Sequence, residues 1–287
     1  MKKNVIENIT VTLRKADGVL YPVKDRKDKV MIVLSGSEGG LAHAKKLAKY
    51  LQTNGIPALA LGYFKTANSV KSLSKIELEN IKEAIDWLKQ MGYKKIGIEG
   101  YSKGAEYAAA AAIAFHELSC VILKTPSWFY SEGMNRKTPS KTSCWSYKGR
   151  ELPYTPYKTR KLPIIKEIIK NREYNILAIN MNKKINPDSI ISIEKIKAPI
   201  LMFSTKMDTI WPSKESCEKL EERLISYNFF YPYKHIGFEH MSHMMLEDCG
   251  DSIKYFIKSE KRYPKECARE RSVMGQECIR WIEEVWQ

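Results

Sequence analysis

Residues 94–107 read KKIGIEGYSKGAEY, and this stretch decides the fold class. Its front half is a short apolar run typical of a strand, and the run AEYAAAAAIAFHEL that follows predicts an apolar helix. Between them, GYSKG at 100–104 fits the pattern G-x-S-x-G, in which small residues permit a sharp strand-to-helix turn that lifts a serine hydroxyl above the sheet. The stretch therefore predicts a strand, a tight turn and a helix, with Ser102 as a candidate nucleophile.

Apolar runs and helical periodicities alternate on both sides of this stretch. Alternating apolar residues over 5–23 flank Asp17-Gly18 and predict an opening antiparallel hairpin with its turn there. Strands are predicted at 29–35, 56–64, 94–100, 119–125, 198–206 and 233–238, with helices between most of them and a last helix near 268–286. Right-handed crossovers place such helices on either side of a parallel sheet. The sequence therefore predicts an α/β fold with a mostly parallel eight-stranded sheet and helices on both faces.

The alternation stops between about residues 126 and 187, directly after the sixth predicted strand. No linker divides the chain, so we expect a single domain over residues 1–287, with a cap or lid-like insertion at 126–187. The insertion is rich in prolines and aromatic residues. As substrate-binding residues we favour Trp128, Trp145 and Tyr147. Other aromatic side chains that could line an acyl pocket, or simply fasten the insertion to the core, are Phe129, Tyr154 and Tyr157.

Composition excludes several classes of protein. The formal net charge of +15 comes from lysines spread along the whole chain, and no nucleic-acid recognition motif accompanies it, so we expect no nucleic-acid partner. We expect no membrane span and no exported leader, because no long apolar run is present, and hence a cytoplasmic protein. The cysteines are too scattered for a zinc site or a disulfide framework; they are Cys120, Cys144, Cys217, Cys249, Cys267 and Cys278. Neither a metal nor another cofactor is predicted.

A serine nucleophile needs a base and an acid, which in this arrangement follow it in the order acid, then histidine. Asp208 lies just beyond the strand APILMFSTK, where the carboxyl ends of parallel strands meet. His240 and His243 both lie in EHMSHMML, the loop after the last predicted strand, and both are candidate bases. We favour His243, because a small residue precedes it and it has the longer reach.

Backbone amides are predicted to stabilise a developing oxyanion. One is the amide of Lys103, directly after the nucleophile. The second is expected from the loop SGSEGG at 35–40, where we favour Ser37 and then Glu38. This loop lacks the lysine and hydroxyl pairing of a phosphate-binding loop, so nucleotide hydrolysis is not predicted.

Together these residues resemble the α/β-hydrolase superfamily. More narrowly, VLSGSEGG, GYSKGAEYA, KIKAPILMFSTKMDTIWPS and HIGFEHMSHMM are similar to the catalytic C-terminal domain of acyl-CoA thioesterases and bile acid-CoA:amino acid N-acyltransferases, a branch near the dienelactone hydrolases. The resemblance covers most of 30–287 and implies Ser102 as nucleophile, Asp208 as acid and His243 as base. Because Phe238 and Ser242 stand where the family usually has Tyr and Gly, His240 stays open as the alternative base.

The resemblance implies a serine hydrolase that cleaves a carboxylic ester or thioester of a small molecule, with acyl-CoA-like thioesters the favoured class. In this family the nucleophile is Cys or Ser, and the serine here favours hydrolysis over transfer to an amine. An acyl-CoA:amino acid N-acyltransferase and a dienelactone-hydrolase-like esterase are the alternative enzymes. A catalytically inactive hydrolase fold that serves as a binding module is the alternative from another class. The sequence does not indicate an oligomeric state.

Overall fold

A computed structural model describes residues 7–135, 138–158 and 184–287. At its centre is an eight-stranded sheet with the strand order β1-β2-β4-β3-β6-β7-β12-β13. The six strands from β4 to β13 are parallel to one another, while β2 is antiparallel to both β1 and β4. The predicted α/β-hydrolase sheet is therefore confirmed. Its strands are β1 Ile9–Thr12, β2 Asp17–Tyr21, β3 Lys29–Leu34, β4 Ala58–Gly62, β6 Lys95–Tyr101, β7 Leu118–Lys124, β12 Ile200–Thr205 and β13 Tyr233–Phe238.

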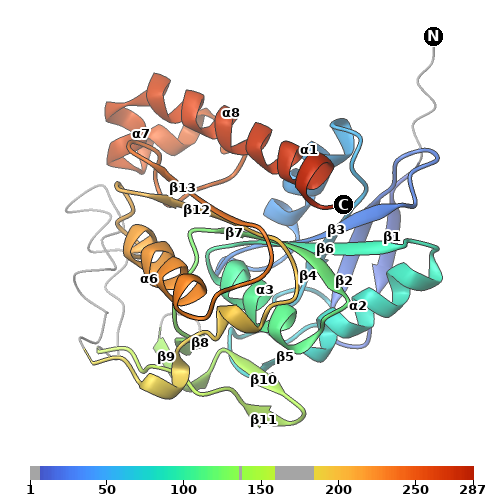
Figure 1. The fold of residues 1–287 in the computed structure, drawn as a ribbon, viewed down its shortest axis with the longest axis horizontal. Coiled ribbons are helices and arrows are strands. Elements are labelled where there is room, and N and C mark those ends of the chain that lie inside the picture. The colour runs from blue at the N-terminus through green and yellow to red at the C-terminus, as the bar shows by residue number, and fades with distance from the viewer. Residues whose placement is uncertain (1–6, 136–137, 159–183) are drawn as a thin grey trace.

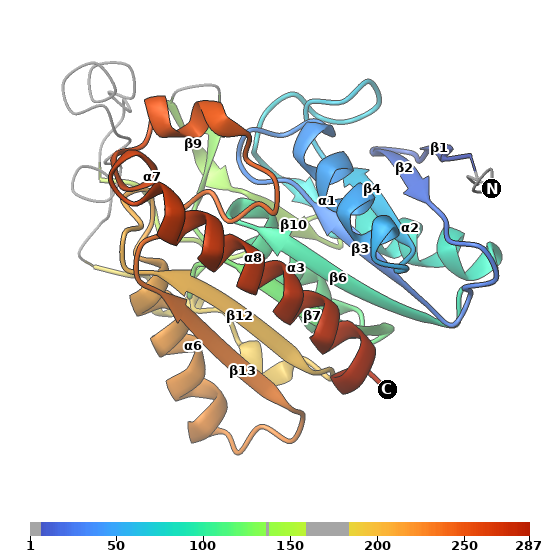
Figure 2. The same ribbon diagram turned by 90° about the horizontal axis from the view of Figure 1, so that it is seen from above.

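Helices cover both faces of this sheet (Figure 1). On one face lie α1, Ala42–Thr53, and α8, Pro264–Arg280, which ends in a π-helical turn. Figure 2 shows α8 running across the central strands and α1 over β3 and β4. On the other face lie α2, Glu79–Gln90, α3, Lys103–Ala114, and α6, Ser213–Ser226. Because both faces are covered, central strands such as β3 and β12 are buried along their whole length and are apolar almost throughout.

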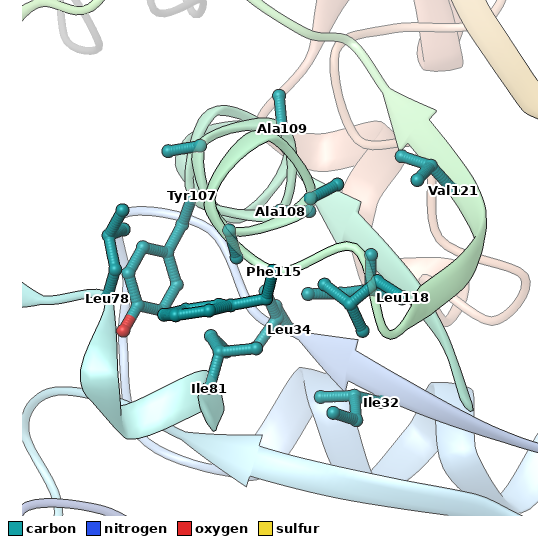
Figure 3. Close-up of a cluster of buried hydrophobic side chains, with 14 of the residues drawn as sticks. Ile32, Leu34, Leu78, Ile81, Tyr107, Ala108, Ala109, Phe115, Leu118 and Val121 are labelled. Atoms are coloured by element: carbon teal, nitrogen blue, oxygen red, sulfur yellow. The ribbon is translucent and has the colours of Figure 1, made fainter. Parts of the chain in front are cut away.

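The apolar core lies in two layers, one on each side of the sheet. In the layer beneath α3, Ile32 and Leu34 of β3 meet Ala108 of the helix (Figure 3). Alanines along α3 let the helix backbone approach the sheet closely, and larger side chains from neighbouring segments, such as Phe115 and Leu118, fill the space around it. This close packing fixes the position of the first turn of α3, which directly follows the predicted nucleophile Ser102.

The opening hairpin exists, but its turn is not at Asp17-Gly18. The chain reverses over residues 13–16, where the amide of Leu13 donates to the carbonyl of Ala16. Asp17 and Gly18 are the first two residues of β2, and Gly18 pairs with Leu61 of β4. A Cβ at Gly18 would lie 3.0 Å from the Ala60 carbonyl oxygen. The glycine therefore serves close strand packing rather than a turn.

The segment after β7 forms short strands that the sequence pattern did not indicate. β8, Glu132–Asn135, pairs with β9, Thr138–Ser143. β10, Trp145–Tyr147, pairs with β11, Arg150–Glu151, and also with β5, Ile76–Glu77, which precedes α2. The described part of the predicted insertion is thus tied to the main body through β5. The remaining short elements are η1 Pro187–Ser189, η2 Ile193–Lys195, η3 Asp251–Tyr255 and α7 Lys258–Arg262.

The described residues contain no helix with the length and apolar character needed to span a bilayer. All six cysteines are free thiols, and all except Cys249 are buried. The cysteines therefore pack as small apolar side chains.

Candidate active site

Ser102 lies at the turn between β6 and α3 in a strained backbone conformation, with φ 55° and ψ −119°. The two glycines around it are required by the packing. A Cβ at Gly100 would lie 2.1 Å from the carbonyl oxygen of Gly104, and a Cβ at Gly104 would lie 2.3 Å from that of Ser35. Such a strained turn exposes a side chain at the carboxyl edge of the sheet.

Three predicted side chains lie in one hydrogen-bonded chain. The Nε2 atom of His243 is 2.8 Å from Ser102 Oγ, and its Nδ1 atom is 2.9 and 2.8 Å from the two oxygens of Asp208. A carboxylate only accepts hydrogen bonds, so His243 carries its proton on Nδ1 and Nε2 accepts from the serine hydroxyl. The His243 and Asp208 side chains are only 4% and 1% exposed, which shields their interaction from water.

Asp208 is held in place by the turn that follows β12. Its Oδ1 atom accepts hydrogen bonds from the backbone amides of Ile210 and Trp211, at 3.0 and 2.9 Å. Two amide donors and the imidazole fix the orientation of the carboxylate. Residues 208–211 therefore form a tight turn around the Asp208 carboxylate. This turn also places Ile210 and Trp211 at the site.

The loop that carries His243 is anchored by acidic residues from the C-terminal helices. Glu260 of α7 accepts from the Ser242 hydroxyl at 2.6 Å and pairs with Arg271 of α8 at 2.9 Å. Glu270 of α8 accepts from the amide of Met241 at 2.7 Å. These contacts hold the two residues directly before His243, Met241 and Ser242, and so help to place the imidazole. No sequence pattern marks these acidic residues, because they lie 18 and 29 residues away from their partners in the loop.

His240, the alternative base, lies in a different environment. Its Nδ1 atom is 2.9 Å from Glu270 Oε1, and its ring packs edge-on against Tyr263, 4.7 Å between centroids. The imidazole next to Ser102 is that of His243, whose ring lies 5.5 Å from the ring of Tyr101. The structure therefore brings His243, and not His240, together with Ser102 and Asp208.

Two of the predicted oxyanion-binding residues, Lys103 and Ser37, line the same cavity as Ser102. Lys103 is the first residue of α3, and an amide at this helix position has no partner inside the helix. Ser37 is exposed and shares a cavity with Ser102. The side chain of Glu38 turns away to the amide of Gly36 and to His43, at 2.9 and 2.8 Å. Within the described residues, the Ser37 and Glu38 amides make no hydrogen bond and stay available for a ligand.

A cavity of about 60 Å³ opens beside the Ser102 hydroxyl. Among the described residues its lining includes Tyr157 of the insertion but not Trp128, Trp145 or Tyr147. Trp145 is fully buried and stacks on Tyr107, and Tyr147 packs edge-on against Phe115. Trp128 packs edge-on against Phe129. Among the residues that the structure describes, the lining consists of Ser37, Ser102, Lys103, Glu106, Thr125, Ser127, Met134, Tyr157, Ile210 and Trp211.

Another buried cluster of charges lies beneath the site. The ammonium of Lys124, at the end of β7, pairs with both Glu99 of β6 and Glu247 of the histidine-bearing segment, and all three side chains are 4% exposed or less. Together with Cys278, the two carboxylates have the spacing of metal ligands. Lys124 already supplies the cation that compensates these carboxylates, so we interpret the cluster as a structural ion-pair network.

The eight-stranded sheet, the strained serine turn and the Ser102–His243–Asp208 chain define a protein with the α/β-hydrolase fold. Residues 76–248 match the family described as "BAAT / Acyl-CoA thioester hydrolase C terminal". This match covers more than half of the chain, which belongs to that family.

Curated relatives and solved structures agree with this placement. The chain is 25% identical to human acyl-coenzyme A thioesterase 6 over 197 residues, which cover 68% of this chain and 44% of that protein. It is 23% identical to mouse acyl-coenzyme A thioesterase 1, covering 68% and 43%. The chain thus spans less than half the length of these relatives.

Two solved structures share the fold. A putative dienelactone hydrolase from Klebsiella pneumoniae has a TM-score of 0.60 at 13% identity, with 98% of this chain and 100% of that chain covered. The esterase Pf2001 from Pyrococcus furiosus has a TM-score of 0.57 at 17% identity, with 96% and 93% covered.

Proposed function

We propose that the protein is a serine hydrolase that cleaves carboxylic ester or thioester bonds, with acyl-CoA-like thioesters as the favoured substrates. The observation that carries the proposal is the hydrogen-bonded chain from Ser102 through His243 to Asp208, which lies beside a cavity. The distances from Ser102 Oγ to His243 Nε2 and from His243 Nδ1 to Asp208 Oδ2 are both 2.8 Å. Membership of the thioester hydrolase family, and relatives that are named as acyl-coenzyme A thioesterases, support the favoured substrate class.

In the first half of the reaction, Ser102 Oγ attacks the carbonyl carbon while His243 Nε2 takes its proton. Asp208 keeps the imidazole in the required tautomer and stabilises its charged form. The negative oxygen of the tetrahedral intermediate accepts hydrogen bonds from the amides of Lys103 and Ser37. The intermediate then collapses, the protonated His243 donates its proton to the leaving thiolate or alkoxide, and the acyl group stays on Ser102.

In the second half, water replaces the leaving group. His243 Nε2 takes a proton from the water as it attacks the acyl carbon, and the same amides hold the oxyanion. Collapse releases the carboxylic acid and returns the proton to Ser102 Oγ. Transfer to an amine would follow the same path with the amine in place of water.

A substrate panel tests this proposal. Purified protein is given short- and medium-chain acyl-CoA thioesters and p-nitrophenyl acetate, each with and without glycine or taurine. We expect CoA or nitrophenol release without conjugate, and a kcat lower by about 10⁴-fold or more in Ser102→Ala and His243→Ala. We expect His240→Ala to stay near the wild type, because its imidazole contacts Glu270 rather than Ser102.

Four outcomes would overturn parts of the proposal. Turnover that survives in Ser102→Ala would remove Ser102 as nucleophile, and loss of activity in His240→Ala alone would reassign the base. Formation of an amide conjugate would identify an acyltransferase. No turnover of any ester or thioester by a folded wild-type protein would favour the binding module.

A further inference from the structure

The cavity beside Ser102 contains a buried ion pair. Lys103 and Glu106 lie one turn apart on α3, and the Lys103 Nζ atom is 2.8 Å from Glu106 Oε2. Their side chains are 9% and 1% exposed. Neither side chain has a role in the serine hydrolase mechanism above, which uses only the backbone amide of Lys103. Burial of a charged pair is costly, so its presence in the wall of a substrate cavity needs a separate explanation.

Glu106 has a full set of hydrogen-bond partners. Its Oε1 atom accepts from the Trp145 indole at 2.8 Å and from the Ser131 amide at 3.0 Å, and its Oε2 atom accepts from Lys103. Both carboxylate oxygens already accept hydrogen bonds from these donors. Glu106 therefore has little capacity left for a ligand.

Lys103 is the partner that is able to serve a ligand. Burial acts to lower its pKa, but the neighbouring Cys144 and Glu106 outweigh burial and raise its pKa above the ordinary value, so the side chain is an ammonium. Its Nζ atom also contacts the Ser131 hydroxyl and lies 5.6 Å from the ring centroid of Trp211. An ammonium has only donors, and it interacts best with an oxygen acceptor.

The rest of the cavity sets the size of what binds there. Its apolar wall is formed by Met134, Tyr157, Ile210 and Trp211. The volume of about 60 Å³ is well below the 150 Å³ or so of a cavity that holds benzene. In pockets of this kind a few polar groups among apolar walls decide which ligand is accepted.

We propose that the Lys103 side chain determines acyl specificity by selecting a short acyl group that carries an oxygen acceptor, above all a carboxylate, over a hydrocarbon group of the same size. This inference rests on the proposed hydrolase function. A hydrocarbon group would cover the ammonium without giving it a hydrogen bond. A carboxylate, in contrast, accepts a hydrogen bond from the ammonium in place of the water that it displaces. The Glu106 carboxylate holds the Lys103 ammonium in place and partly offsets its positive charge.

The test compares malonyl-CoA with isovaleryl-CoA, whose acyl groups have the same size and branching but differ in charge. We expect the wild type to have a kcat/KM at least about tenfold higher for malonyl-CoA, the effect of a charged hydrogen bond. Lys103→Met should reduce this ratio to about one or below. Glu106→Gln keeps the shape and one of the two acceptor oxygens but removes the countercharge, so it should raise the ratio. The exposed Lys45→Met on α1 is the control and should leave the ratio unchanged.

Lys103→Met leaves the buried Glu106 carboxylate without its cation, which can prevent folding. A second variant therefore keeps the inference testable if this one misfolds. The double variant Lys103→Met with Glu106→Gln removes both charges, and thermal melting checks that it folds. If it has the wild-type ratio, or if both single variants change turnover of the two thioesters by the same factor, the pair is structural and the inference is wrong.

Failure of the inference is distinguishable from failure of the proposed function. Hydrolysis of p-nitrophenyl acetate that depends on Ser102, combined with a malonyl to isovaleryl ratio near one in the wild type, would overturn the specificity inference alone. Absence of any hydrolysis that depends on Ser102 would overturn both.

Discussion

At the scale of single residues, the two glycines of the serine turn are the most sharply constrained positions. A Cβ at Gly104 would lie 2.3 Å from a backbone oxygen of the loop after β3. Because the clash is with the backbone, no side-chain rotation can relieve it. We expect Gly104→Ala to displace the turn and to lower kcat/KM by at least about 100-fold, because misplacement by about 1 Å costs that much. Steady-state kinetics and thermal melting measure the two effects.

Gly237→Ala is the matched control for this prediction. Gly237 lies in β13, and a Cβ there would come no closer than 3.6 Å to Ser204 Oγ, an ordinary contact distance. We expect its activity and stability to be close to those of the wild type. Equal losses in the two variants would show that the turn is not the sensitive point.

Residues differ in how far the sequence alone predicts them. Ser102, Asp208 and His243 could be predicted because each follows a strand, and the carboxyl ends of parallel strands meet at one edge of a sheet. Glu106 could not, because its role depends on Ser131 and Trp145, which lie 25 and 39 residues further along the chain. Trp128, Trp145 and Tyr147 are absent from the cavity lining among the described residues, and a tryptophan pattern in the sequence does not distinguish a pocket wall from a buried core.

At the scale of elements, two neighbouring residues of α6 distinguish the helix face that packs on the sheet from the face that is exposed to solvent. Leu224 is fully buried against the sheet, whereas Ile225, its neighbour in sequence, is 61% exposed. Leu224→Ala should lower the free energy of unfolding by about 2 to 5 kcal/mol, and Ile225→Ala by no more than about 0.5 kcal/mol. Urea denaturation of the two variants measures the difference. Similar values for both would contradict the packing described for this face.

Most elements follow directly from local pattern, and the exceptions have identifiable causes. The central parallel strands are apolar along most of their length, and helices such as α1 and α2 have clear periodicity, so these elements were predicted within a few residues. The predicted position of the turn in the first hairpin was wrong. Asp17-Gly18 matches a common turn dipeptide, but the glycine instead permits close packing against Ala60. The short strands β8 to β11 are too brief to show a periodicity, and β10 is specified by its pairing with the distant β5.

At the scale of the whole molecule, the Glu99–Lys124–Glu247 network joins β6, β7 and the segment after His243. Burial, the largest influence, raises the pKa of Glu99 from 4.5 to about 7, with Lys124 opposing the shift and Glu247 adding to it. A carboxyl whose pKa is raised in the folded state contributes stability below its unfolded pKa, and this stability is lost as pH rises. Further titratable groups that interact with Glu99 are Tyr50, Cys120 and Cys278.

We therefore expect the stability of the wild type to fall relative to that of Glu99→Gln as the pH rises from about 5 to 8. The expected difference is roughly 1 to 3 kcal/mol, because only the part of the shift between pH 5 and the folded pKa of about 7 contributes, at about 1.4 kcal/mol per pH unit. Urea denaturation at both pH values measures it. Glu239→Gln, whose side chain is exposed, is the control and should follow the wild type. The same pH dependence in wild type and Glu99→Gln would contradict this account of the network.

The most direct test of the central claim is labelling with a fluorophosphonate, which reacts with an activated serine. Intact-protein and peptide mass spectrometry then show how many labels bind and where. We predict a single adduct on the peptide that contains Ser102, its absence in Ser102→Ala, a strong reduction in His243→Ala, and normal labelling in His240→Ala. A folded wild-type protein that takes up no label, or takes it up at another residue, would contradict the assignment of Ser102 as the nucleophile of a hydrolase.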